Sequence, residues 1–136
     1  MKKLTAWSYS SINTFKSCPK KYYHLRVARD VKDTGSAAMS YGNAVHKAAE
    51  QYIKEGTPIP PKFSFVEESL KVLKGIEGEK HCEIKLSLAK ADGDYYPTTY
   101  FAKDVWWRGI ADLLIVDEDK AYLIDYKTGK NAKYAD

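Results

Sequence analysis

Cysteine is scarce in this sequence, and its scarcity argues against two classes of small protein. Only Cys18 and Cys82 occur among the 136 residues, and they form no Cys-x-x-Cys pair. A small secreted fold held by disulfides and a self-contained structural zinc site both need more cysteines than this, at closer spacing. We therefore expect neither, and we expect no role for thiol chemistry.

Long apolar runs are also missing. No segment approaches the roughly 18 consecutive apolar residues of a membrane span. Residues 1–8 lack the uninterrupted apolar stretch of a secretion signal. We therefore expect a cytoplasmic protein with no membrane partner.

Two common catalytic motifs are absent. No His-Glu-x-x-His helix of a zinc protease occurs, and Thr128-Gly129-Lys130 lacks the preceding glycine that a nucleotide-binding phosphate loop requires. These absences argue against a zinc protease and a nucleotide-binding loop.

Positive charge is concentrated at the beginning of the chain. Residues 1–32 hold eight Lys or Arg and one acidic residue, although the formal net charge of the whole chain is only +4. Such a segment indicates either a surface that contacts DNA phosphates or a solvated helix face. The candidate DNA-binding residues are Lys16, Lys20, Lys21 and Arg26.

Helical periodicity dominates the first half of the chain. Residues 9–27 predict two short helices separated at Pro19, and residues 30–40 predict a loop. Residues 40–53 then predict an amphipathic helix that ends near Gly56, and residues 65–73 predict another.

Strand patterns follow the helices. In residues 81–89 apolar and polar side chains alternate, which predicts a half-buried strand. Its expected apolar face consists of Cys82, Ile84, Leu86 and Leu88. Residues 95–103 predict a further strand.

Two apolar runs flank the acidic residues 117–119 and predict a β-hairpin. A two-residue loop would set Asp112 directly opposite Asp125. Directly opposed Cβ atoms are roughly 5 Å apart, so two carboxylates there are destabilising unless a cation lies between them. Lys127 projects from the same face as Asp125, because side chains alternate along a strand. Two carboxylates that hold a divalent metal, with a lysine ammonium beside it, are typical of a site that cleaves phosphodiester bonds. A three-residue loop would make the pairing diagonal.

Two further residues have open roles. His46 lies beside the apolar stripe of its predicted helix, where a lone histidine is more often packed or capping than metal-bound. Glu83 faces away from the apolar side of its strand, so it reaches either the metal site or solvent.

Four blocks of sequence occur in a particular order along residues 8–130. The first block has two parts, Ser8-Tyr9-Ser10-Ser11 and Cys18-Pro19-Lys20-Lys21-Tyr22-Tyr23. The other three are Tyr41-Gly42-Asn43-Ala44-Val45-His46, Gly109-Ile110-Ala111-Asp112 and Ile124-Asp125-Tyr126-Lys127-Thr128-Gly129-Lys130. Together they resemble the RecB-type exonuclease branch of the PD-(D/E)XK nuclease superfamily. The resemblance implies an α/β, restriction-endonuclease-like fold with a mixed sheet flanked by helices.

The resemblance also implies the active site. The catalytic residues would be Asp112, Asp125 and Lys127. The metal ligands would be His46, Asp112, Asp125 and the backbone carbonyl of Tyr126, and Glu83 is a further candidate. The cofactor would be Mg²⁺ or Mn²⁺, and an imidazole ligand favours Mn²⁺. Some relatives hold an iron–sulfur cluster through one cysteine near the position of Cys18 and three near the C-terminus. This trio is absent, so we expect no such cluster within the chain.

From the resemblance we expect a metal-dependent DNA exonuclease that processes DNA ends in recombination or repair of bacterial or phage DNA. Its partners would be DNA and a helicase or recombination protein, in a bacterial cell or a phage-infected host. The first alternative is a non-catalytic DNA-binding or assembly subunit of a recombination complex, and the second is a purely structural interaction domain.

The expected organisation is one nuclease domain, residues 1–136. It would consist of a basic helical segment, residues 1–35, and a nuclease core, residues 36–136. The family fold continues after the lysine with a helix and a strand, so we expect a domain truncated at its C-terminus. The sheet left uncovered would then favour self-association.

Overall fold

The chain folds into two compact units. The computed structural model describes residues 5–128. The first unit comprises residues 1–34 and 85–110, and the second comprises residues 35–84 and 111–136. Strands β1 (Glu79–Ala91) and β3 (Val105–Val116) contribute residues to both units.

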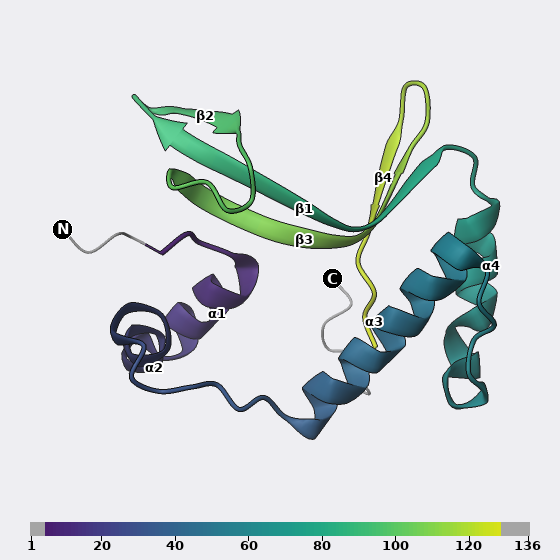
Figure 1. Cartoon of the computed structure of the whole chain (residues 1–136), viewed down its shortest axis with the longest axis horizontal. Helices are drawn as coiled ribbons and strands as arrows, with labels where there is room; N and C mark the ends of the chain where they lie inside the picture. The colour runs from purple at the N-terminus through teal and green to yellow at the C-terminus, as the bar shows by residue number, and fades with distance from the viewer. Residues whose placement is uncertain (1–4, 129–136) are drawn as a thin grey trace. The chain divides into compact units, whose positions relative to one another are not determined.

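The strands form one open sheet after the helices, which confirms the expected α/β class. Its strand order is β2-β1-β3-β4, with β2 at Asp94–Pro97 and β4 at Ala121–Ile124 (Figure 1). The β1–β2 and β3–β4 pairs are antiparallel. The four-stranded sheet is thus antiparallel and not mixed as expected; among the described residues, parallel pairing is limited to an isolated bridge between Trp7 and Trp107. Strand β2 ends at Pro97, earlier than the expected strand over residues 95–103.

In the second unit, helix α3 (Ala37–Glu55) supplies one side of the core. The Ser36 side chain accepts a hydrogen bond from the Met39 N–H at 3.2 Å and caps the helix. This cap starts the helix inside the segment expected to be a loop. Gly56 ends it with a φ of 72°, a left-handed conformation that glycine adopts without a Cβ clash.

The second helix of this unit completes the core. A 3₁₀ turn, η2 (Pro61–Val66), leads into α4 (Glu67–Gly75), so the segment expected to be one helix changes type at Glu67. The buried core cluster is Ala49, Ile53, Leu70, Cys82, Leu113 and Ile115. This core fixes β3 and the start of β1 against α3 and α4.

The β3–β4 hairpin has the predicted two-residue loop. Asp117 and Lys120 exchange backbone hydrogen bonds with N···O distances of 2.8 and 3.3 Å, which leaves two residues between them. Continued from the observed pairs, this register places Asp112 opposite Asp125. Strand β4 ends at Ile124, so the expectation that Asp125 and Lys127 lie within the strand is wrong: both follow it.

Strand β1 contains a backbone irregularity at Glu83, whose φ is 52°. The buried residues of β1 are Cys82, Ser87 and Ala89. The expected apolar face is therefore wrong beyond Cys82, and Leu86 and Leu88 are 45% and 36% exposed. A residue in the left-handed region interrupts the alternation of a strand, which moves the following side chains to the other face.

In the first unit, short helices follow one another as predicted. Helix α1 (Tyr9–Ser17) starts at a reciprocal cap between Ser8 and Ser11, and α2 (Pro19–Tyr22) starts at the predicted break. A π-helical segment, η1 (Tyr23–Ala28), continues from α2. Within residues 5–128, no helix is long and apolar enough to cross a membrane.

Candidate metal centre

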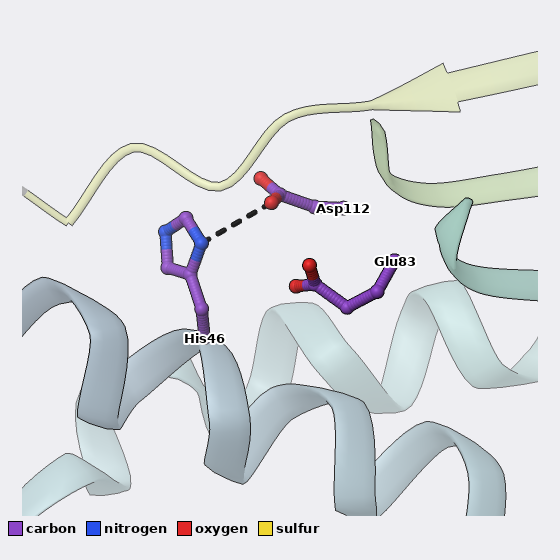
Figure 2. Close-up of side chains that lie close together, drawn as sticks. All are labelled: His46, Glu83 and Asp112. Carbon is purple, nitrogen blue, oxygen red and sulfur yellow. Dashed lines mark ion pairs between the residues drawn. The ribbon is translucent and has the colours of Figure 1, made fainter. Parts of the chain in front are cut away.

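Three side chains that are distant in the sequence meet in the second unit. They are His46 from α3, Glu83 from β1 and Asp112 from β3, and the two carboxylates point toward the imidazole (Figure 2). One potential ligand atom from each residue lies within 4.8 Å of the other two. The His46 side chain is 27% exposed and the Asp112 side chain 11% exposed.

Asp112 is held at both of its carboxylate oxygens. Its Oδ1 lies 3.2 Å from His46 Nδ1, and its Oδ2 accepts a hydrogen bond from the Tyr126 N–H at 2.6 Å. Burial raises the pKa of Asp112, but the hydrogen bonds from His46 and from the Tyr126 backbone outweigh it and hold the pKa below its ordinary value. Asp112 is therefore a carboxylate at neutral pH.

His46 is fixed on both sides of its ring. Its Nε2–H donates to the Tyr126 carbonyl at 2.9 Å, and the Tyr126 ring packs edge-on at 5.6 Å between centroids. The hydrogen bond with Asp112 is the main cause that raises the pKa of His46. A metal-binding histidine usually donates its second ring N–H to a carbonyl or carboxylate, which fixes the tautomer. Nδ1 is thus the nitrogen directed at the carboxylates.

Glu83 reaches the cluster because of its backbone. Its left-handed φ of 52° interrupts the strand next to Cys82, and a non-glycine residue pays roughly 1–2 kcal/mol for this conformation. Burial, and then the charge of Asp112, raise the pKa of Glu83. The Asp112 charge thus opposes ionisation of Glu83, and a cation between the two carboxylates would relieve this.

The donor atoms of the cluster would have to draw together around a divalent ion. Adjacent ligand atoms on an octahedral Mg²⁺ are about 3 Å apart, because each lies roughly 2.1 Å from the ion. His46 Nδ1 and Asp112 Oδ1 are 3.2 Å apart, a separation that their own contact sets, whereas the donor atoms of all three residues lie within 4.8 Å of one another. One imidazole nitrogen with two carboxylates is also a donor set that suits Mn²⁺.

Asp125 and Lys127 form an ion pair with each other beside this cluster. Their side chains are 64% and 56% exposed, so both face solvent more than Asp112 does. The Asp125 side chain also contributes to the lowered pKa of Asp112. The expected catalytic roles of Asp125 and Lys127, and the expected Tyr126 carbonyl ligand, stay predictions.

Glu50 lies one helical turn after His46 but is already neutralised. Its carboxylate forms ion pairs with Lys47 at 2.8 Å and Lys54 at 2.7 Å. The hydrogen bonds from these two lysines lower the pKa of Glu50. We therefore treat Glu50 as a surface ion-pair residue.

The predicted DNA-binding residues lie on the helices of the first unit. Lys16 is on α1, Lys20 and Lys21 are on α2, and Arg26 is on η1; all four are exposed. Their role stays a prediction. Gly129 and Lys130, the last residues of the fourth sequence block, lie outside the described residues.

A comparison with protein families agrees with this geometry. The family model of the PD-(D/E)XK nuclease superfamily matches residues 6–136. The chain belongs to this superfamily. No curated protein and no solved structure matches the chain. PD-(D/E)XK nucleases use divalent metals, which suits the cluster of His46, Glu83 and Asp112. Membership in a nuclease superfamily also implies DNA as the substrate.

Proposed function

We propose that this nuclease is a metal-dependent DNA exonuclease that acts on DNA ends in recombination or repair of bacterial or phage DNA. The observation that carries the proposal is the meeting of His46, Glu83 and Asp112 within 4.8 Å. Two carboxylates and an imidazole in one half-buried site are a donor set for a divalent ion, whose charge would offset the cost of burying both carboxylates.

His46, Glu83 and Asp112 would hold the ion, and Asp125 would join them from the segment after β4. When bound, the ion supplies Lewis acidity at phosphate oxygens and lowers the pKa of water. The Tyr126 carbonyl accepts the His46 Nε2–H at 2.9 Å, which leaves Nδ1 as the nitrogen that would bind the ion. The Lys127 ammonium would stabilise negative charge that develops on the phosphate oxygens.

The imidazole in this donor set favours Mn²⁺ over Mg²⁺, which prefers oxygen ligands. We therefore propose that cleavage is faster in Mn²⁺ than in Mg²⁺ and is absent in Ca²⁺.

The test compares cleavage of a linear duplex labelled at one end with cleavage of a covalently closed circle of the same sequence. An exonuclease degrades the linear DNA and leaves the circle intact. Asp112→Asn should abolish cleavage, whereas Asp119→Asn, a matched change at an exposed hairpin position, should retain it.

Two outcomes would contradict the proposal. Cutting of the circle would identify an endonuclease. DNA binding without metal-dependent cleavage of either substrate would favour the alternative, a non-catalytic DNA-binding or assembly subunit.

A further inference from the structure

The first unit contains a cavity of about 720 Å³ that is lined by cationic and aromatic side chains. Its charged lining residues are Arg26, Arg29, Lys103 and Arg108. Its aromatic lining residues are Trp7, Phe15, Tyr22 and Phe101. Among the described residues, no carboxylate lines this cavity, so an anionic ligand meets no like charge in its wall.

The cations of this cavity are available to a ligand. In the part of the chain that the structure describes, none of the four forms an ion pair with a carboxylate. Arg26, Arg29 and Lys103 are exposed, and the Arg108 guanidinium lies 5.1 Å from the centre of the Tyr100 ring. Stacked arginine keeps its N–H groups free for a phosphate.

The backbone fixes the aromatic wall beside these cations. The Trp7 N–H donates to the Trp106 carbonyl at 2.8 Å, and the Arg108 N–H donates to the Trp7 carbonyl at 2.9 Å. The Trp7 ring stacks on Tyr22 with 5.3 Å between centroids and 16° between planes. This stack and the strand pairing hold Trp7 and Arg108 next to each other.

Phe101 differs from the other aromatic residues because its side chain is 78% exposed. Exposing a large apolar ring to water is unfavourable, and here the ring lies within a cationic lining. Aromatic rings beside basic groups are the pattern with which proteins bind single-stranded nucleic acid, through base stacking and phosphate contacts.

The charge of the whole first unit supports an anionic ligand. Residues 1–34 and 85–110 contain twelve Lys or Arg against five Asp and no Glu, whereas the complete chain has a net charge of only +4. The remaining residues are therefore net acidic, and the first unit is where a DNA phosphate is attracted.

We propose that this cavity binds an unpaired nucleotide of single-stranded DNA, with its base against Phe101 and its flanking phosphates on Arg26, Arg29, Lys103 and Arg108. Inside duplex DNA both faces of a base are covered by its neighbours, so away from the duplex ends only an unpaired base can offer its face to the ring. The inference rests on the proposed function, since the pocket would hold the single-stranded DNA on which the nuclease acts.

Binding can be measured apart from cleavage. Fluorescence anisotropy of the complete chain in EDTA, with labelled oligothymidine and a labelled, fully paired blunt duplex, reports affinity with no divalent metal present. The test variants are Phe101→Ala and the triple variant Arg26→Gln, Arg29→Gln, Lys103→Gln. The charge-matched control changes three exposed lysines of the second unit, Lys62→Gln, Lys71→Gln, Lys120→Gln.

We expect Phe101→Ala to weaken oligothymidine binding about tenfold and to leave binding of the fully paired duplex within twofold. The triple variant should reduce the slope of log affinity against log salt by about 2, because each phosphate contact on a single strand contributes roughly 0.7. The control should leave this slope unchanged.

An unchanged oligothymidine affinity in Phe101→Ala, an equal loss on the duplex, or an equal change of slope in the control would overturn the inference. If any of these three overturning results occurs and the wild-type protein still cleaves DNA in Mn²⁺, the proposed nuclease function stands and only the nucleotide pocket is refuted. If the variants behave as expected but the wild-type protein cleaves nothing, the pocket stands and the nuclease proposal fails.

Discussion

Replacement of Glu83 by glycine is expected to stabilise the metal-free protein and to weaken its metal binding. Glu83 has a φ of 52°, which costs a non-glycine residue roughly 1–2 kcal/mol. Glycine avoids this cost but loses about 0.5–1 kcal/mol of backbone entropy on folding. The substitution also removes a carboxylate whose pKa is raised by burial and by Asp112, and which is therefore unfavourable when ionised. We expect a net gain of about 1 kcal/mol.

The assay is thermal unfolding in EDTA and in excess Mn²⁺. A gain of 1 kcal/mol raises the melting temperature by about 4 °C in a protein of this size. At a metal concentration of about 100 Kd, the wild-type protein should gain roughly 2.7 kcal/mol, whereas Glu83→Gly should gain much less. The order of stability should therefore reverse between the two conditions.

Two variants separate backbone strain from metal binding. Asp92 also has a positive φ, 51°, and follows β1 in the turn to β2, so Asp92→Gly should be more stable than the wild type and keep the full Mn²⁺ shift. Glu83→Gln keeps the backbone strain and should lose the shift. A Glu83→Gly protein that melts below the wild type in EDTA, or that retains the full Mn²⁺ shift, would refute the reasoning.

Three further predictions concern the same centre. Lys127→Ala should lower the rate of DNA cleavage by about 100- to 1,000-fold in single-turnover assays and change DNA affinity by only a few-fold, because its charge acts on the transition state. His46→Ala should weaken Mn²⁺ binding in calorimetry by at least tenfold while urea unfolding in EDTA changes little; equal metal affinity in both proteins would remove His46 from the ligands. In EDTA, the raised pKa of His46 gives stability that is lost as pH rises through that pKa, and the lowered pKa of Asp112 gives stability that is lost as pH falls through its own. The stability difference between the wild type and Asp112→Asn in urea unfolding should thus be largest between about pH 4 and 6.5, and a constant difference up to pH 9 would contradict the His46–Asp112 pairing.

Local sequence was sufficient to predict the β3–β4 hairpin. The two apolar runs and the acidic residues between them determine where the chain turns, and hydrogen bonds between Asp117 and Lys120 confirm a two-residue loop. The position of Asp112 opposite Asp125 follows from this register alone. Such features depend on neighbouring residues and on the period of a strand.

The orientation of Glu83 could not be read from the sequence. An alternating pattern assumes a regular strand, and nothing in residues 81–89 marks a left-handed residue, which is usually glycine or asparagine. This conformation decides both which side chains of β1 are buried and whether Glu83 reaches His46. The earlier start of α3 does have a signal in the sequence. Ser36 is a favourable N-cap residue and directly precedes the helix, which begins at Ala37.

The backbone of Tyr126 is held at both of its polar groups, since its N–H binds Asp112 and its carbonyl binds His46. This residue separates Asp125 from Lys127, so the spacing between the carboxylate and the ammonium is set by one clamped peptide unit. The side chain at position 126 takes part in neither bond. Another apolar side chain that fills the same space can therefore replace the ring at this position. An inserted or deleted residue, by contrast, would shift Asp125 or Lys127 and separate the lysine from the ligand cluster.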